Sequence, residues 1–168
     1  MRILILLCLT FLLSFSVQSQ MPVTKAQATY IAYYTQYVQW PDVDLSDGFT
    51  IGIAGSDELQ KELEVLLNGR KINDRLILIK KVTVVGEIEK CNILFVSFDK
   101  NNILADAIKL SAKNNILLIT ERAGAIERGA LINFVVINNL LKYQLNEAIV
   151  AKTKLNVNPI LYKMAVKP

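Results

Sequence analysis

The sequence predicts an α/β domain, a three-layer α/β/α sandwich with a mostly parallel sheet and a C-terminal antiparallel edge hairpin. Strands that are covered on both faces are almost continuously apolar and need helices on each side. Four short runs have this pattern, and they span residues 76–79, 93–96, 116–119 and 132–137. Segments with helical spacing of apolar residues lie between and around these runs, so the fold class follows from the order of the two patterns.

The first segment, residues 1–19, has the features of a secretory signal peptide. Arg2 gives it a positive start, an unbroken apolar run covers residues 3–13, and Ser19 provides a small residue at its end. The alternative, an uncleaved membrane anchor, is less favoured because the apolar run is shorter than the ~20 residues that a spanning helix needs. We therefore expect a signal peptide over residues 1–19 and one domain over residues 20–168, outside the cytoplasm.

The first half of the domain is expected to contain a helix, a strand and a second helix. Apolar and aromatic residues recur at helical spacing over residues 24–40, and Pro41 ends that helix at the preceding residue. Residues 49–54 alternate as in a strand, and residues 59–67 have helical spacing up to Gly69. The residues expected to face inward are Tyr30, Ile31, Tyr34, Tyr37 and Val38 in the first helix and Leu59, Leu63, Leu66 and Leu67 in the second.

The second half is expected to end in a hairpin and short helices, after a helix over residues 103–112. Asn138 and Asn139 form a plausible tight turn, since asparagine tolerates the left-handed backbone that hairpin turns require. Asn146 is able to cap a helix over residues 147–153. The order Asn158-Pro159 is typical of the start of a helix, here one that buries Ile160, Leu161, Met164 and Ala165.

Composition excludes several classes of chemistry. The chain has no histidine, which removes Ser-His and Cys-His nucleophilic pairs and the usual zinc ligand sets. Phosphate-binding and calcium-binding loop motifs are also absent from the sequence. The net charge of +4 is spread along the chain, so it is weak evidence for nucleic-acid binding. We expect a protein that is not an enzyme and that uses no metal or cofactor.

The number of cysteines indicates that an ordinary hydrophobic core, and not disulfide bonds, stabilises the domain. Cys8 lies inside the apolar N-terminal run, so the secreted chain keeps Cys91 alone and forms no internal disulfide. Cys91 is either a small buried hydrophobe or, beside Lys90, a reactive thiol.

Two loops are candidate binding sites. Gly55 and Ser56 lie between a strand and a helix, where backbone N–H groups are able to face an anion; the favoured interpretation is a turn with Ser56 or Asp57 as cap. The second loop follows the carboxyl end of a strand, where open α/β sheets tend to bind ligands; its alternative is a solvated loop of weakly paired charges. Its charged residues are Glu121, Arg122, Glu127 and Arg128.

An ordered set of segments resembles the YfiR family of secreted bacterial proteins. No single motif is diagnostic, but the order and spacing match over about residues 24–166. The segments are Tyr37-Val38-Gln39-Trp40-Pro41, Ile53-Ala54-Gly55, Cys91-Asn92-Ile93-Leu94-Phe95-Val96-Ser97, Leu118-Ile119-Thr120-Glu121, Gly129-Ala130-Leu131-Ile132-Asn133-Phe134, and Leu141-Lys142-Tyr143-Gln144-Leu145-Asn146 followed by Ala151, Leu155 and Leu161.

The resemblance implies a periplasmic α/β regulator, often a homodimer, without catalytic residues. Such a protein represses an inner-membrane signalling enzyme, typically a diguanylate cyclase of cyclic-di-GMP signalling, by binding its extracytoplasmic sensor domain. Some relatives serve a sensor kinase instead, and an OmpA-like outer-membrane lipoprotein sequesters the repressor in the best-known arrangement. Redox-regulated members carry several periplasmic cysteines, whereas Cys91 alone remains here, so disulfide control within one monomer is impossible.

Three functions therefore stay open from the sequence. The leading hypothesis is a repressor that binds its partner through the loop from Arg122 to Arg128 and aromatic surface near Trp40. The alternative is a periplasmic small-ligand sensor that uses the crevice near Gly55 and Glu121. The third is a secreted enzyme that uses Cys91, which requires an accessible thiol with a low pKa.

Overall fold

A computed structural model describes residues 21–41 and 48–167 of the chain. The predicted signal peptide, residues 1–19, lies outside the described residues. Within the described ranges, no helix has the length and apolar character needed to cross a membrane.

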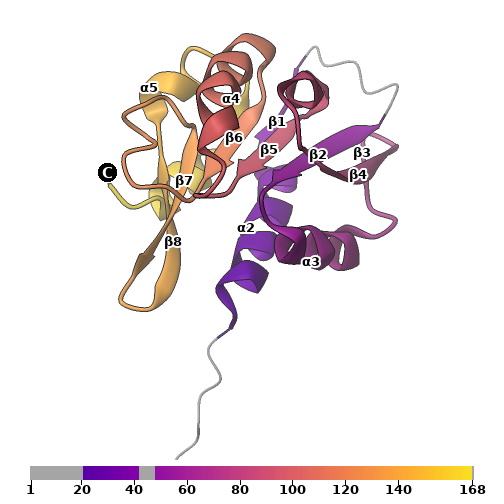
Figure 1. Cartoon of the computed structure of the whole chain (residues 1–168), viewed down its shortest axis with the longest axis horizontal. Helices are drawn as coiled ribbons and strands as arrows, with labels where there is room; N and C mark the ends of the chain where they lie inside the picture. The colour runs from indigo at the N-terminus through magenta and orange to yellow at the C-terminus, as the bar shows by residue number, and fades with distance from the viewer. Residues whose placement is uncertain (1–20, 42–47, 168) are drawn as a thin grey trace, which may run out of the picture.

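The domain is built on a curled seven-stranded mixed sheet, with strand order β3-β4-β2-β5-β6-β7-β8 (Figure 1). The strands from β4 to β7 pair in parallel, while β3 and β8 add antiparallel pairings at the two edges. A separate two-stranded sheet joins β1 to β9. The strands are β1 (Val38–Gln39), β2 (Phe49–Ala54), β3 (Lys71–Ile72), β4 (Arg75–Lys81), β5 (Ile93–Val96), β6 (Leu117–Thr120), β7 (Ile132–Ile137), β8 (Leu140–Leu145) and β9 (Asn156–Val157).

Three of the helices, α3, α5 and α6, begin where the sequence supplies a side-chain cap. The Ser56 hydroxyl accepts a hydrogen bond from the Leu59 N–H, and Asn146 and Asn158 cap the next turns in the same way. Each cap satisfies a backbone donor that the first turn of a helix leaves unpaired, as the sequence predicted. The helices are α2 (Val23–Tyr37), α3 (Asp57–Leu67), α4 (Asn101–Asn114), α5 (Glu147–Val150), α6 (Pro159–Met164) and the 3-10 helix η1 (Val85–Lys90).

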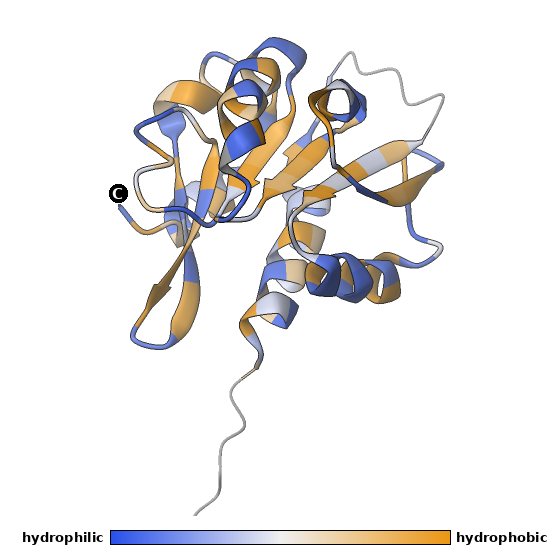
Figure 2. Cartoon of the chain, in the orientation of Figure 1, coloured by the Kyte–Doolittle hydropathy of each residue, from blue (hydrophilic) through white to orange (hydrophobic). Residues whose placement is uncertain are grey.

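The core follows the central strands. All residues of β2, β5 and β6 are buried, and Leu59 and Leu63 of α3 pack against this sheet from one side. Figure 2 shows the apolar colour of the central strands beside the polar outer face of α3. An aromatic cluster joins α2 to β5, β7 and β8, and it consists of Tyr30, Tyr34, Phe95, Phe134 and Tyr143.

The α/β class and the C-terminal antiparallel hairpin are confirmed, and the sheet is mixed, with parallel pairing from β4 to β7 and antiparallel pairing at both edges. The sequence analysis missed the β3–β4 hairpin, whose turn residues Asn73 and Asp74 have φ values of 48° and 64°. That hairpin places β4 near an edge, so Leu76 is 49% exposed instead of covered on both faces. The turn at Asn138 and Asn139 is as predicted, with φ values of 50° and 60°. The three-layer arrangement stays a prediction.

The end of the first predicted helix and the burial of four helical residues are also wrong. Helix α2 ends at Tyr37 instead of continuing to Trp40, because Val38 and Gln39 pair with β9. Four residues that were expected to be buried are exposed instead, because the surrounding described elements leave these side chains uncovered. These residues are Tyr37, Leu66, Ile160 and Met164.

Candidate functional site at the carboxyl ends of the parallel strands

The chain reverses its direction of travel across the sheet between β2 and β5. Strand β2 leads through α3 to β4 on one side, and the chain then crosses to β5 on the other side of β2. Open α/β sheets bind their ligands outside the carboxyl ends of the strands at such a switch point. The strand ends that meet here carry Gly55 after β2, Ser97 after β5 and Glu121 after β6.

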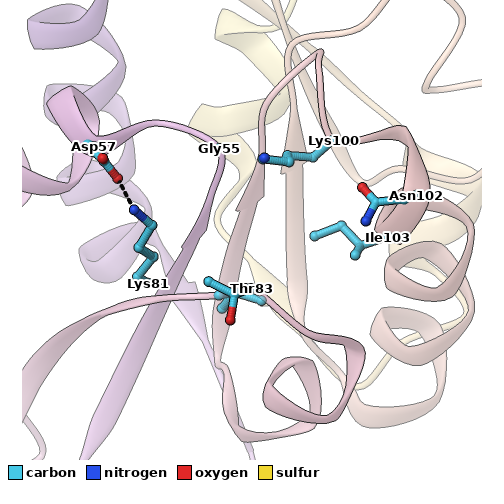
Figure 3. A pocket seen from close by; sticks show the side chains of 8 residues that line it. Gly55, Asp57, Lys81, Thr83, Lys100, Asn102 and Ile103 are labelled. Carbon is cyan, nitrogen blue, oxygen red and sulfur yellow. Dashed lines mark hydrogen bonds and ion pairs between the residues drawn. The ribbon is translucent and has the colours of Figure 1, made fainter.

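A hollow of about 290 Å³ lies at this switch point (Figure 3). The Asp57 carboxylate and the Lys81 ammonium form an exposed salt bridge of 2.6 Å on one wall. The hydrogen bond and the positive charge of Lys81 lower the pKa of Asp57. An anion at the start of α3 would therefore meet the Asp57 carboxylate. The lining residues are Gly55, Asp57, Lys81, Val82, Thr83, Lys100, Asn102 and Ile103.

Gly55 is required by the close approach of two loops. Its φ is +96°, a left-handed conformation that favours glycine. A Cβ atom there would lie 2.7 Å from Lys100 Cγ and 2.9 Å from Ser97 Cβ. Ser56 acts as the cap of α3, the interpretation that the sequence favoured. This turn therefore positions α3 against the loop that follows β5.

Glu121 joins three elements at the same edge. Its carboxylate accepts hydrogen bonds from Gln27 Nε2 of α2 at 2.7 Å and from Ser97 Oγ at 2.8 Å. Gln27 and Ser97 are both buried, so these bonds satisfy polar groups that water does not reach. Arg122 Nη1 donates to the Phe98 carbonyl at 2.9 Å, and the Arg122 N–H donates to Asn133 Oδ1 at 2.8 Å. Both residues hold the ends of β5 and β6 together.

The loop after β6 is folded on itself. Ala125 and Ile126 are buried, and Asn146 Nδ2 donates to the Ile126 carbonyl at 2.8 Å. Arg128 donates from Nε to the Gly124 carbonyl at 3.1 Å, whereas Glu127 is exposed. Replacing Arg122 or Arg128 by glutamate would remove hydrogen bonds that hold this region, so such variants are poor probes of partner binding alone.

Trp40 lies at the opposite edge of the sheet. Its Nε1 donates to the Asn92 carbonyl at 3.2 Å, and its ring packs edge-on against Phe49 with centroids 4.8 Å apart. Asn92 and Phe49 lie at the amino ends of β5 and β2. The structure therefore brings Gly55, Ser56, Glu121 and Arg122 to one edge of the sheet and separates them from Trp40.

A family model described as YfiR/HmsC-like matches residues 24–166. The chain belongs to the YfiR/HmsC-like family. A crystal structure of a conserved domain protein from Vibrio cholerae O1 biovar El Tor has a similar fold, with a TM-score of 0.58 and 10% sequence identity. The match covers 89% of this chain and 61% of that one, so this chain spans less than two thirds of that protein. A search of curated protein sequences finds no match.

In this YfiR/HmsC-like chain, the thiol of Cys91 lies inside the core. Cys91 is 6% exposed, and its Sγ donates to the Glu87 carbonyl at 3.5 Å. Burial raises the pKa of Cys91 to about 12. A nucleophilic cysteine needs the opposite, an accessible thiol with a lowered pKa. Within residues 21–41 and 48–167, no group of three or more Cys, Asp or Glu side chains is arranged to hold a metal ion.

A second hollow of the YfiR/HmsC-like domain, larger than the one at the switch point, is one that the sequence analysis did not find. Its volume is about 660 Å³, and it lies between α2, the turn of the β7–β8 hairpin and α6. The sequence signal was present, because Val23, Ala26 and Tyr33 have helical spacing on a face of α2 separate from Ile31 and Tyr34. Only the packing of distant segments shows that this second face stays uncovered.

Proposed function

We propose that this YfiR/HmsC-like protein is a periplasmic regulator that represses an inner-membrane signalling enzyme by binding its extracytoplasmic domain. The observation that carries the proposal is the family match, which covers residues 24–166 and thus nearly all of the expected secreted domain. The enzyme is a diguanylate cyclase or a sensor kinase, as the family resemblance implies. An OmpA-like outer-membrane lipoprotein and a second copy of the chain are the other expected partners.

The mechanism requires differential affinity and no catalytic group. A regulator that binds the inactive conformation of a sensor domain more tightly shifts the equilibrium of the enzyme toward that conformation. A tenfold bias requires a difference in binding free energy of only about 1.4 kcal/mol. The absence of histidine and the burial of Cys91 are consistent with such a role.

The test combines physical capture with a cellular measurement. The tagged full chain is expressed with its own N-terminal segment, recovered from the periplasm and incubated with detergent-solubilised membranes of the source cell. We expect mass spectrometry to identify a membrane cyclase or kinase, and deletion of the gene to raise the cyclic-di-GMP level or the phosphorylation output of the captured enzyme. Recovery of no such enzyme, together with unchanged signalling in the deletion strain, would refute the proposal.

A second candidate function is a small-ligand sensor, and the hollow at the switch point favours it. This function predicts that a small metabolite raises the melting temperature of the protein in the absence of any partner. The effect should disappear in Lys100→Ala, which changes the wall of the hollow, and persist in Lys109→Ala, on the exposed side of α4. Equal responses of the two variants would contradict this placement.

A further inference from the structure

An apolar groove runs along α2 and is open to solvent. Its first part is the hollow of about 660 Å³ between α2, the β7–β8 turn and α6. A second hollow of about 260 Å³ continues it toward the C-terminal end of α2. The two share Tyr30, Tyr33 and Met164, so we treat them as one surface, the α2 groove.

The α2 groove concentrates the apolar surface of the described residues. Half of the large apolar side chains that these residues expose line the two hollows of the groove. Contiguous exposed apolar surface of this kind marks sites of interaction with another molecule. The exposed lining residues are Met21, Val23, Tyr33, Tyr37, Leu140, Ile160 and Met164.

The spacing of the groove residues on α2 indicates which kind of secondary structure would fit into the groove. The row runs at alternating intervals of three and four residues, which is the a/d spacing of a helix that packs lengthwise against another helix. Its members are Val23, Ala26, Tyr30, Tyr33 and Tyr37. The row spans the whole of α2, about 22 Å at 1.5 Å per residue. A helix of about two heptads would cover it.

The charged residues near the groove indicate which sign of charge a partner would carry. Residues 21–40, 130–146 and 156–167 contain no aspartate or glutamate, and their charged residues are all lysines. Glu58, which accepts a hydrogen bond from Thr24, lies on α3, and Thr24 is on a different face of α2 from the groove residues. Glu147 lies on α5 near Tyr162 of α6, which does not line the groove. The positive charge of the elements that form the groove disfavours a second copy of the same surface and favours an acidic partner. The lysines are Lys25, Lys163 and Lys167, together with Lys142, whose alternation with the groove residues Leu141 and Tyr143 along β8 places it on the other face of the sheet.

We propose that the α2 groove binds an amphipathic helix of a partner protein, with an apolar a/d seam and acidic flanking residues. The helix would lie along α2, between the β7–β8 turn and α6, in the helix-in-groove mode of recognition. This inference rests on the proposed function only in taking the partner to be a protein. It places binding away from both loops that the sequence analysis selected.

The probe is a stapled, fluorescein-labelled helix of about two heptads with leucine at a and d and glutamate at the flanking positions. Its matched control has lysine at the flanking positions. Binding to the full-length secreted protein is measured by fluorescence anisotropy. We expect the acidic peptide to bind about tenfold more tightly than the basic one. Equal affinity of the two peptides, or binding of neither, overturns the proposal.

Variants locate the site. Tyr33→Glu, at a side chain that is 48% exposed, should weaken binding of the acidic peptide about tenfold or more. Val65→Glu is the matched control, because it adds the same charge at an 81% exposed apolar position on α3, away from the groove. Circular dichroism checks that both variants are folded. A loss of affinity that is equal in the two variants overturns the placement.

Two further outcomes would assign the groove to another occupant. Binding to phosphatidylglycerol vesicles that Tyr33→Glu abolishes, without binding of the acidic peptide, would make it a membrane surface. A dimer that Tyr33→Glu dissociates in analytical ultracentrifugation, again without peptide binding, would make it a self-association surface. Either result overturns the proposal.

The experiments distinguish a failure of the groove proposal from a failure of the proposed regulator function. If Tyr33→Glu still represses the signalling enzyme in cells, the groove is not the regulatory surface, although the regulator function stands. If deletion of the gene leaves signalling unchanged while the acidic peptide binds and Tyr33→Glu does not, the regulator function fails and the groove proposal stands.

Discussion

Two tyrosines of the aromatic cluster are buried to the same extent but differ in their hydrogen bonds. Tyr143 is 1% exposed, and its hydroxyl donates to the Leu161 carbonyl at 2.7 Å. Tyr34 is fully buried, and its hydroxyl has no hydrogen-bond partner among the described residues. Burial raises the pKa of Tyr143 to about 12 and that of Tyr34 well above its usual range. Replacing each tyrosine by phenylalanine removes the hydroxyl and keeps the ring.

The two substitutions should change the free energy of unfolding in opposite directions. Tyr143→Phe loses a buried hydrogen bond, but the Leu161 carbonyl keeps the Ala165 N–H at 3.2 Å as a donor. The expected loss is therefore about 1 kcal/mol. Tyr34→Phe removes an unpaired buried hydroxyl, whose burial costs about 1–3 kcal/mol in protein mutational data, so we expect a gain of about 1 kcal/mol. The ring contacts of Tyr34 with Tyr30 and Phe134 remain.

Urea unfolding and thermal melting measure this difference. For a domain of this size, a change of 1 kcal/mol shifts the melting temperature by about 2–4 °C, so the variants should differ by about 4–8 °C. Equal m-values would show that the unfolded states are comparable. If Tyr34→Phe is destabilised as much as Tyr143→Phe, the Tyr34 hydroxyl has a partner in the folded protein and the reasoning is wrong.

Three further predictions concern the glycines and the thiol at the centre of the sheet. In Gly52→Ala the new Cβ would lie 2.5 Å from Cys91 Sγ, so we expect the free energy of unfolding to fall by about 1–3 kcal/mol. Adding Cys91→Ala should restore part of this loss, because it removes the sulfur atom. Additive effects in the double mutant would contradict this reasoning. Gly55→Ala combines a φ of +96° with contacts as short as 2.7 Å and should cost about 2 kcal/mol or more, measured by urea unfolding; a neutral effect would show that the loop moves freely. The Cys91 pKa is raised from 9.0 to about 12, so its contribution to stability is complete below pH 9 and is lost as the pH rises toward 12. Alkylation of the native thiol should accordingly be slow at pH 8, and the stability of Cys91→Ala should fall less steeply above pH 9 than that of the wild type; rapid alkylation of folded protein would contradict the burial.

The features of the fold that sequence predicted well are local. The apolar runs 93–96 and 132–137 coincide with β5 and β7, because continuous apolar runs of this length are typical of buried strands. The caps Ser56, Asn146 and Asn158 and the turn at Asn138 and Asn139 were also recognisable, since each depends on side-chain chemistry within a few residues.

The candidate site was predictable only in part. Gly55 and Glu121 follow strands, so their place at the carboxyl edge could be inferred from the order of the elements. The partners of Glu121 could not, because Gln27 lies 94 positions away and reaches it only through the packing of α2. Trp40 was expected to bind a partner together with the loop from Arg122 to Arg128, but its contacts with Phe49 and Asn92 hold it at the opposite edge of the sheet.

The sequence by itself determined the α/β class, the family and the local signals that start and end the elements, because these depend on residue type and spacing along the chain. Tertiary structure alone decided where α2 gives way to β1, why the sheet also has an antiparallel pairing at its β3–β4 edge, and which apolar faces stay uncovered. Met164 has the spacing of a core residue yet is 49% exposed, and Tyr33 lines a groove beside it. A helix face is buried or open according to which distant segments pack against it, and those long-range contacts are not encoded in the period of any one element.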